Sequence, residues 1–266
     1  MLLVMHLSRL LLGYKSPTTN HGIISAPIRT KRLQKMAALR SIFVSGANQG
    51  LGMYAVHQLA STPDVLVFMA SRKLVAAEEA LAKFSSDVHP SSTVVPVQLD
   101  ITDPASIQAA HDFVAETLKE KNLPGLDVLV NSAAIMFASE PTAIFATNVF
   151  GTANLKDVFY PLLTQSTGSI LNISSSLGSN TLFSQRPAFM PPIYTYYSAS
   201  KAALNSLTVQ WALQEEQKSS GIRVVAICPG LNSTNLTGFM DGVGDPEEGC
   251  KVIVKEALER DGKNSV

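Results

Sequence analysis

The segment Ser41-Ile42-Phe43-Val44-Ser45-Gly46-Ala47-Asn48-Gln49-Gly50-Leu51-Gly52 decides the fold class of this chain. Its short apolar run, Ser41–Val44, is typical of a buried strand, and it leads through a glycine-rich turn into a helical pattern over Gly52–Ala60. Glycines let the backbone turn sharply and approach a pyrophosphate, while the N-terminus of the next helix offers free N–H groups. We therefore predict a nucleotide-binding loop with contacts from Ser45, Gly46, Asn48, Gly50, Leu51 and Gly52.

Apolar strand-like runs alternate with helical patterns over the rest of the chain. We expect further strands at Val65–Ala70, Thr93–Leu99, Asp127–Val130, Ser169–Ile173 and Arg223–Ile227. The expected helices are Lys73–Phe84, Pro104–Glu120 with Asp103 as its cap, Ala143–Leu163, Tyr196–Gln217 and Pro246–Arg260. Continuous apolar strands separated by helices indicate a parallel sheet that is covered on both faces.

The predicted fold class is therefore α/β, a single-domain doubly wound parallel sheet (Rossmann-like) with helices on both faces. We expect its final strand to be absent or very short, because Gly262–Val266 end the chain where that strand would begin. A glycine loop with the spacing GxxxGxG, rather than the commoner GxGxxG, can also be purely structural. The strand before it and the helix after it favour nucleotide binding.

Length and composition limit the classes of function. A chain of 266 residues, 46% of them hydrophobic, can bury the core of one α/β domain. Lysine plus arginine and aspartate plus glutamate are balanced at 21 each, so no nucleic acid is expected as a partner. The two cysteines, Cys228 and Cys250, match neither a disulfide framework nor a metal site. We expect a reducing compartment and no metal.

The first 63 residues contain no acidic residue but several basic ones. We assign residues 1–36 to a leader, disordered or targeting, and residues 37–266 to the nucleotide-binding domain. The apolar run Met1–Gly13 is shorter than the roughly 20 residues that span a bilayer, so no stable membrane span is expected. The leader resembles a mitochondrial presequence, lacks an obvious secretory cleavage site, and can also be a plain extension before Met36. We expect a cytoplasmic protein, or a mitochondrial one if the leader is a presequence.

Polar residues recur at the predicted carboxyl ends of the strands, where ligands bind in open α/β sheets. Arg72 follows the second strand, and no acidic residue lies between Asp64 and Glu78. An acid here would bond the adenosine ribose of NAD(H), whereas an arginine can pair with the 2′-phosphate of NADP(H). We predict NADP(H), with a solvated surface arginine as the alternative.

Asp100 ends the third strand and either contacts the adenine or caps the next turn. The remaining predicted cofactor contacts are Asn131, Tyr197, Lys201, Pro229 and Thr234.

Tyr197 and Lys201 lie four positions apart on one face of an expected helix. Such a pair is frequent and usually marks a surface, but here it follows Ser174-Ser175-Ser176 at one strand end and precedes Cys228-Pro229-Gly230 at the next. Asn148 lies within the expected helix before them. A phenol with its ordinary pKa of about 10 exchanges protons poorly at neutral pH, and nearby positive charge favours its ionised form.

In this order, the motifs resemble those of the short-chain dehydrogenase/reductase family, in its branch of short single-domain members. The resemblance covers about Leu39 to Arg260. The family's TGxxxGxG loop is matched with Ser45 in place of threonine, and its NNAG motif appears as Asn131-Ser132-Ala133-Ala134. A strand end of the N-I-x-S type, Asn172-Ile173-Ser174-Ser175, is followed by the YxxxK and PGxxxT motifs.

The resemblance implies an NADP(H)-dependent oxidoreductase that interconverts a ketone or aldehyde and an alcohol by hydride transfer. Carried over by position, Tyr197 is the general acid and base, and Ser175, ahead of Ser174 and Ser176, bonds the substrate oxygen. Lys201 also reaches the nicotinamide ribose, and Asn148 holds a water that links the lysine to solvent. The resemblance further implies a homodimer or homotetramer that acts on a small molecule.

The chain departs from the family pattern at three places. Ala134 replaces the last glycine of NNAG, and only 17 positions separate Asn131 from Asn148, so the helix of Asn148 should start abruptly. Ser175 and Tyr197 are 22 positions apart, which is longer than usual. The inserted residues 179–195 contain three aromatic residues, three prolines and Met190, and they should border the substrate pocket, with Leu236–Val243 as the other wall.

This apolar content favours a hydrophobic or aromatic carbonyl substrate, with an ordinary packed loop as the alternative. Two other functions share the fold: a catalytically silent NADP(H)-sensing protein, and an isomerase or dehydratase. A silent sensor would keep the glycine loop but lose the tyrosine or the lysine. The presence of Asn148, Ser175, Tyr197 and Lys201 together favours the oxidoreductase.

Overall fold

Six parallel strands form the centre of the structure, a computed structural model that describes residues 39–185 and 193–260. Within these residues the strand order is β3-β2-β1-β4-β5-β6. The strands are β1 (Arg40–Val44), β2 (Val65–Ser71), β3 (Thr93–Gln98), β4 (Val128–Asn131), β5 (Ser169–Ile173) and β6 (Arg223–Ile227). The chain winds outward in one direction from β1 and in the other from β4, so the carboxyl ends of these two neighbours flank the switch point where such sheets bind ligands.

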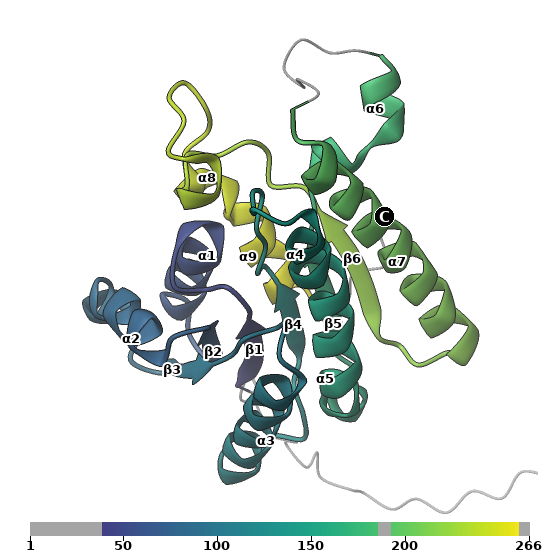
Figure 1. Cartoon of the computed structure of the whole chain (residues 1–266). Helices are drawn as coiled ribbons and strands as arrows, with labels where there is room; N and C mark the ends of the chain where they lie inside the picture. The colour runs from purple at the N-terminus through teal and green to yellow at the C-terminus, as the bar shows by residue number, and fades with distance from the viewer. Residues whose placement is uncertain (1–38, 186–192, 261–266) are drawn as a thin grey trace, which may run out of the picture. The chain divides into compact units, whose positions relative to one another are not determined.

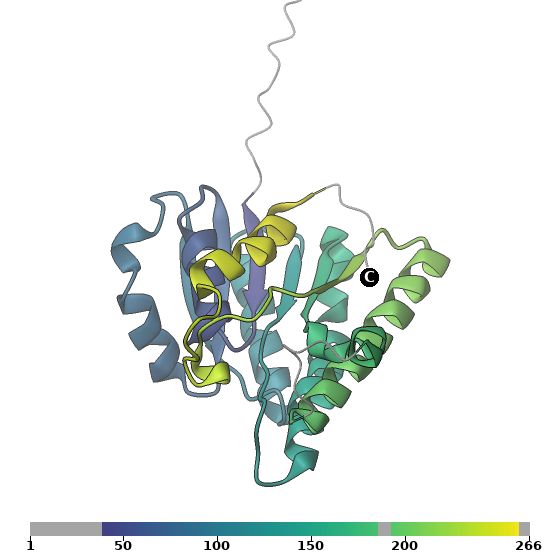
Figure 2. The ribbon, with the colours of Figure 1, turned by 90° about the horizontal axis from the view of Figure 1, so that it is seen from above.

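Helices cover both faces of this sheet, as predicted (Figures 1 and 2). One layer contains α1 (Gly50–Ala60), α2 (Leu74–Ala82) and α9 (Lys251–Leu258), and the other contains α3 (Pro104–Glu120), α5 (Thr152–Ser166) and α7 (Thr195–Lys218). Three short helices, α4 (Pro141–Phe145), α6 (Asn180–Ser184) and α8 (Pro246–Gly249), belong to the connections near the carboxyl ends of the strands. The doubly wound α/β fold is confirmed.

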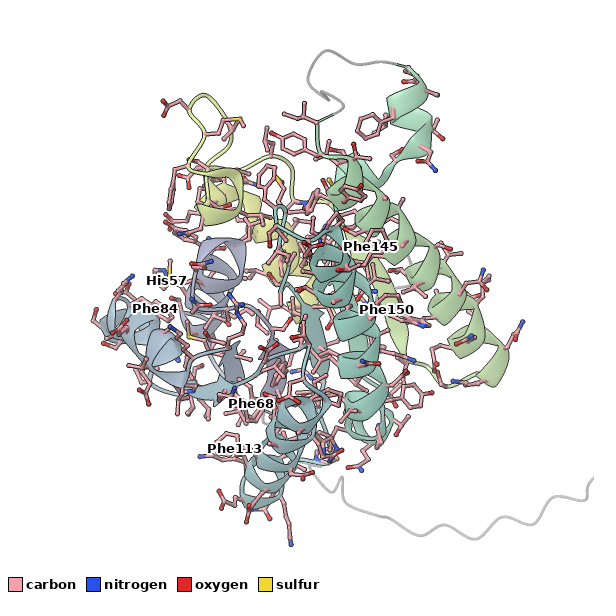
Figure 3. All side chains as sticks on the ribbon, in the orientation of Figure 1. His57, Phe68, Phe84, Phe113, Phe145 and Phe150 are labelled. Atoms are coloured by element: carbon pink, nitrogen blue, oxygen red, sulfur yellow. The ribbon has the colours of Figure 1, made fainter. Side chains whose placement is uncertain are left out.

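The strands pack against the helices on both faces of the sheet, because successive side chains of a strand point to opposite faces. Ile42 and Val44 pack with α1, α2 and α9, whereas Phe43 packs with α3, α5 and α7. All three side chains are fully buried. The outer strand β3 contains Pro96, which an edge strand tolerates because its unpaired side needs no N–H donor. His57 of α1 stacks on Phe84 at 4.8 Å between ring centres, which ties α1 to the segment after α2 (Figure 3).

Most expected elements agree with the structure to within a few residues. The Asp103 carboxylate accepts a hydrogen bond from the Ala105 N–H and caps α3, as expected. The helix expected over Ala143–Leu163 is instead α4 and α5 joined by a π-helical turn, Ala146–Gly151. The helix expected over Pro246–Arg260 is divided at Cys250 into α8 and α9.

Several expectations fall on residues outside the described part of the chain. These are the leader, the segment 186–192 of the long insertion, and the end of the chain at Gly262–Val266. The described part of the insertion includes α6. Among the described residues, no helix has the length and apolar character needed to cross a membrane.

Phe159 offers a test of the layer formed by α3, α5 and α7. Its ring is fully buried and lies 4.7 Å from that of Phe43, measured between centres. We expect Phe159→Ala to lower the free energy of unfolding by about 3–5 kcal/mol in urea denaturation, because it leaves a cavity. Phe113→Ala, at a side chain of α3 that is 47% exposed, should change it by less than about 1 kcal/mol (Figure 3). Equal losses in the two variants would contradict this description of the core.

Candidate active site

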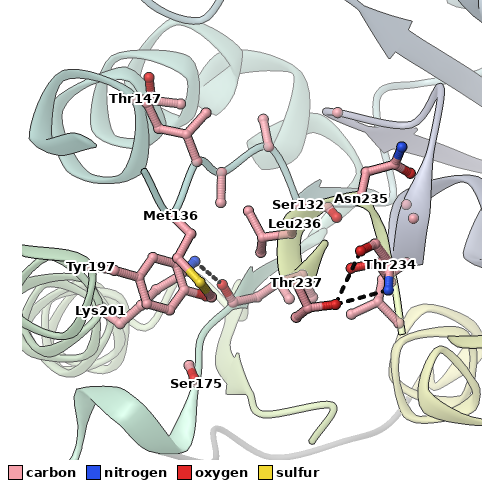
Figure 4. A pocket seen from close by; sticks show the side chains of 18 of the residues that line it. Ser132, Met136, Thr147, Ser175, Tyr197, Lys201, Thr234, Asn235, Leu236 and Thr237 are labelled. Carbon is pink, nitrogen blue, oxygen red and sulfur yellow. Dashed lines mark hydrogen bonds between the residues drawn. The ribbon is translucent and has the colours of Figure 1, made fainter. Parts of the chain in front are cut away.

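A cavity of about 820 Å³ opens at the carboxyl edge of the sheet, at the switch point between β1 and β4. The segments that follow all six strands contribute to its lining. Figure 4 shows Tyr197, Lys201 and Ser175 at one part of this cavity and Thr234 and Asn235 at another. Residues that are far apart in the sequence thus share one pocket, which is the arrangement expected for the predicted site.

The glycine loop forms the floor next to β1. Gly46 has a φ of +65°, and a Cβ at this position would lie 2.6 Å from Ala133 Cα in the loop after β4. Gly50 has a φ of +56° and lies next to Thr234, whose Cβ would be 3.5 Å from a Cβ at Gly50. Gln49, which precedes α1, makes no side-chain cap, so the first N–H groups of this helix are open to a ligand. Asn48, Leu51 and Gly52, three of the predicted cofactor contacts, also line the cavity.

Ser45 and Asn131, two of the predicted cofactor contacts, lie behind the cavity lining. The Ser45 hydroxyl accepts hydrogen bonds from the N–H groups of Ser132 and Ala133 at 3.1 and 3.2 Å, which holds the loop after β4 against β1. The Asn131 amide donates to the Asn172 side chain at 2.8 Å. Both residues are buried, and both support the walls from beneath.

Arg72 and Asp100 line the part of the cavity that adjoins β2 and β3. Asp100 closes its own turn, because its carboxylate accepts hydrogen bonds from the Thr102 N–H at 2.9 Å and hydroxyl at 2.6 Å. The bond from the Thr102 hydroxyl is the main reason why the pKa of Asp100 is lowered. The exposed Arg72 guanidinium makes no ion pair within 4 Å among the described residues, so it is free to bind an anion.

Tyr197 and Lys201 reach the cavity from the first turns of α7. Burial raises the pKa of Tyr197 to about 12, although a hydrogen bond with Ser175 acts in the opposite direction. Lys201 is only 3% exposed, and burial lowers its pKa to about 8. Its Nζ donates to the Ile173 carbonyl oxygen at 2.7 Å and lies 5.6 Å from the centre of the Tyr197 ring. No carboxylate in the described part of the chain pairs with it, so its charge can favour the Tyr197 phenolate.

Ser174 and Ser175, two of the three serines after β5, bond different partners through their hydroxyl groups. The Ser174 hydroxyl donates to the Asn205 side chain of α7, whereas the Ser175 hydroxyl bonds Tyr197 and accepts from the Leu177 N–H. This segment can lie close to α7 because of Gly178, where a Cβ would be 2.8 Å from the carbonyl carbon of Lys201. Of the three candidates, Ser175 is therefore the one that the structure brings to the tyrosine.

Asn148 is buried in the π-helical turn and does not line the cavity. Its side chain bonds both the N–H and the carbonyl of Ile135 at 2.9 Å, and it donates to the Ser200 hydroxyl at 3.0 Å. Ser200 in turn donates to the Tyr197 carbonyl at 2.7 Å. These bonds connect the loop after β4 to the start of α7, so the side chain of Asn148 orients the backbone that carries Tyr197 and Lys201.

The loop after β6 forms the opposite wall and is held by Asn232. Its buried amide donates to the carbonyl groups of Pro229 and Gly230 at 3.0 Å each. The Thr237 hydroxyl bonds the Thr234 N–H and the Asn232 carbonyl, which rigidifies the turn behind Thr234 (Figure 4). Pro229 and Thr234, two further predicted cofactor contacts, line the cavity.

Three supporting residues were not predicted from the sequence: Ser200, Asn205 and Asn232. Each of them forms hydrogen bonds with residues that only the folded chain or a particular loop conformation brings near, so no local sequence pattern marks them. Ser200 alone carried a signal, because it lies directly before Lys201 on a face that the pattern predicts to be buried.

A sequence model of the family described as short chain dehydrogenase matches residues 40–241. The chain is a short-chain dehydrogenase. It is 35% identical over 232 residues to the short-chain dehydrogenase anuI of Penicillium roqueforti, covering 82% of this chain and 88% of that protein. The six-strand sheet and its flanking helices are the Rossmann-like fold of this oxidoreductase family.

Two further relatives bear on the type of reaction. Estradiol 17-beta-dehydrogenase 2 of Mus musculus is 32% identical over 215 residues, which cover 76% of this chain but only 50% of the mouse protein. The crystal structure of NADPH-bound carbonyl reductase from chicken fatty liver matches with a TM-score of 0.69 and 30% identity, covering 84% of this chain and 92% of that one. Short-chain dehydrogenases use NAD(P)(H) and interconvert ketones and alcohols in small molecules.

The cavity of this short-chain dehydrogenase fits such a dinucleotide. The uncapped N-terminus of α1 and the glycine loop suit a pyrophosphate, because the first N–H groups of the helix are free and Gly50, which lines the cavity, carries no Cβ. Arg72 and Asp100 adjoin the place where β2 and β3 end. Tyr197 and Lys201 line the same cavity.

The burial of Lys201 predicts a pH dependence of stability. The pKa is about 8 in the folded chain and 10.5 without the fold, so the unfolded chain binds more protons between these values and stability rises with pH. Relative to Lys201→Met, the wild-type protein without cofactor should gain about 2 kcal/mol in free energy of unfolding from pH 7 to pH 9.5. Urea denaturation at both pH values tests this, and a pH-independent difference between the two proteins would contradict it.

Proposed function

We propose that this protein interconverts a ketone or aldehyde and the corresponding alcohol with NADP(H), and that Tyr197 is its general acid and base. The observation that carries the proposal is the meeting of Tyr197, Ser175 and Lys201 in the cavity that also contains the glycine loop. When bound, the nicotinamide supplies or accepts the hydride. The residues of the chain bind and orient the substrate and move the proton.

In the reducing direction, the Tyr197 hydroxyl donates its proton to the oxygen of the substrate. The Ser175 hydroxyl, which bonds Tyr197, donates a hydrogen bond to the same oxygen and stabilises the negative charge that develops there. Since burial favours the protonated phenol, Tyr197 holds its proton until a stronger base is formed beside it. The Lys201 ammonium then stabilises the phenolate, and its lowered pKa makes it a ready source of a replacement proton.

NADP(H) is preferred over NAD(H) in this proposal because of Arg72. The residue lies in the cavity lining directly after β2, with no acid before Glu78 that could bond a ribose diol instead. The guanidinium suits a phosphate because its N–H donors match the oxygens in pairs. The chicken carbonyl reductase, which is similar to this chain over most of its length, has NADPH bound, and this supports the same choice.

The proposed substrate is hydrophobic. The cavity around Tyr197 is lined by Met136, Leu177, Leu231, Leu236 and Met240. Apolar walls with few polar groups are typical of sites for hydrophobic small molecules. The mouse relative is a dehydrogenase for estradiol, which supports a substrate of this kind.

The mechanism is tested by NADPH oxidation over a panel of hydrophobic ketones. Tyr197→Phe should lower kcat at least about 100-fold, because the proton donor is lost. Ser175→Ala should lower it about 10- to 1000-fold, whereas Ser176→Ala, the matched control, should stay within about 3-fold. Turnover of Tyr197→Phe at the wild-type rate would contradict the mechanism. Tight NADPH binding without turnover of any ketone or alcohol would favour the sensor instead.

The cofactor assignment is tested by calorimetric titration with NADPH and NADH. Arg72→Ala should weaken NADPH binding about 10- to 100-fold, since charge-assisted hydrogen bonds to the phosphate are lost, and leave NADH binding unchanged. Lys73→Ala, at the next basic residue but outside the cavity lining, is the control and should affect neither. Equal weakening of both cofactors in Arg72→Ala would argue against the assignment.

A further inference from the structure

Two aromatic rings from distant parts of the chain meet at the rim of the cavity. Phe137 lies in the loop between β4 and α4, and Tyr194 lies directly before α7. Their ring centres are 5.8 Å apart and their planes are inclined by 53°, which is a favourable aromatic contact. Both rings line the same cavity as Tyr197. Phe137 is nevertheless 67% exposed, so most of its apolar surface is available to a ligand.

The cavity is divided by charge. Its only charged lining residues among those described are Arg72, Asp100 and Lys201. Arg72 and Asp100 adjoin β2 and β3, the side assigned to the nucleotide, and the Lys201 ammonium is bonded to the Ile173 carbonyl. Among the described lining residues near Tyr197, the buried Lys201 ammonium is the single counter-ion open to an anion, and its Nζ already donates to the Ile173 carbonyl. A charged substrate bound there would therefore lose its hydration for little compensation, which is costly.

Exposed acidic side chains beside the rim also disfavour the binding of anionic substrates. The loop of Phe137 also carries Glu140, and the loop of Met240 carries Asp241; both acids are exposed. The lining supplied by these two loops includes Met136 and Met240. Met136, only 8% exposed, lines the cavity together with Tyr197 (Figure 4), and methionine sulfur makes favourable contacts with the edges of aromatic rings.

We propose that the contacting rings of Phe137 and Tyr194, together called the aromatic clamp, form one aromatic surface against which a substrate ring packs, and that this surface makes the protein selective for neutral carbonyl compounds with a planar aromatic ring. The clamp binds the aromatic part of the substrate while its carbonyl group reaches Tyr197 and Ser175. This inference rests on the proposed function, because it places the substrate of that reaction. It adds the two residues that set the preference and excludes carboxylate and phosphate substrates.

The first experiment compares matched substrates in the wild-type protein. 2-Tetralone and 2-decalone have the same carbon skeleton and an unconjugated ketone, and only the former has an aromatic ring. We expect kcat/KM to be at least about 10-fold higher for 2-tetralone, mainly through KM. Methyl 3-benzoylpropionate should likewise exceed its free carboxylate by at least about 10-fold, because the acid brings an unpaired charge.

The second experiment changes the clamp itself. Phe137→Leu and Tyr194→Leu keep apolar bulk but remove a ring, and each should reduce the preference for 2-tetralone about 5-fold. Phe137→Tyr and Tyr194→Phe keep the ring and should retain the preference. Phe150→Leu is the matched control, because this phenylalanine is 62% exposed but does not line the cavity (Figure 3). The dissociation constant for NADPH and the unfolding midpoint should be the same in all variants.

A binding measurement separates failure of the clamp from failure of the proposed reaction. Calorimetric titration with 2-naphthol and with 2-decalol, with and without NADPH, needs no turnover. Tighter binding of 2-naphthol that is weakened about 5-fold in the two Leu variants supports the clamp, even if no ketone is reduced and the proposed function fails. Turnover with equal kcat/KM for both ketones, or a preference that Phe137→Leu and Tyr194→Leu leave unchanged, overturns the clamp and leaves the proposed reaction standing.

Discussion

The close approach of the loops after β1 and β4 is the constraint on which the rest of the site depends. These strands are neighbours at the switch point, and no crossover connection fills the space above their carboxyl ends. A Cβ on Gly46 would lie 2.6 Å from Ala133 Cα, so the two loops can meet only where one of them has no side chain. Ser45 holds this contact with two hydrogen bonds to the second loop. The cavity, the open N-terminus of α1 and the loop of Phe137 all follow from this junction.

The burial of Lys201, a proposed catalytic group, lowers the stability of the fold. Lys201 is buried without a carboxylate partner among the described residues, and a backbone carbonyl is its hydrogen-bond acceptor. A buried, incompletely paired charge destabilises a fold, and active sites commonly retain such groups because the reaction needs them. The bonds from Asn148 to Ile135 and Ser200 compensate by fixing the backbone around the tyrosine. The π-helical turn places Asn148 where it can make these bonds, in line with the frequent occurrence of such turns at functional sites.

The two parts of the cavity differ in character because different segments build them. Backbone N–H groups, Arg72 and Asp100 give the part beside β1, β2 and β3 the polarity that a dinucleotide requires. The part around Tyr197 is lined by the loop after β4, the start of α7 and the loop after β6, whose side chains are mostly apolar. In folds of this kind, loops at the carboxyl edge of the sheet commonly carry the side chains that select the ligand.

The sequence by itself determined the features that depend on local periodicity. Alternating apolar runs indicated a doubly wound sheet, the spacing of Gly46, Gly50 and Gly52 indicated its nucleotide loop, and helical spacing placed Tyr197 and Lys201 on one face. Each of these patterns spans only a few residues, so it can be recognised from a short segment without knowing how the rest of the chain folds.

Only the tertiary structure decided which side chains face the cavity. It distinguished Ser175 from Ser174, because the Ser174 hydroxyl is taken by Asn205 of α7, and it placed Ser45 and Asn131 behind the lining. It also brought Phe137 to Tyr194 across the rim. The physical reason is the same in every case: these contacts join segments that are distant in the chain, and their geometry is set by how the helices and strands pack.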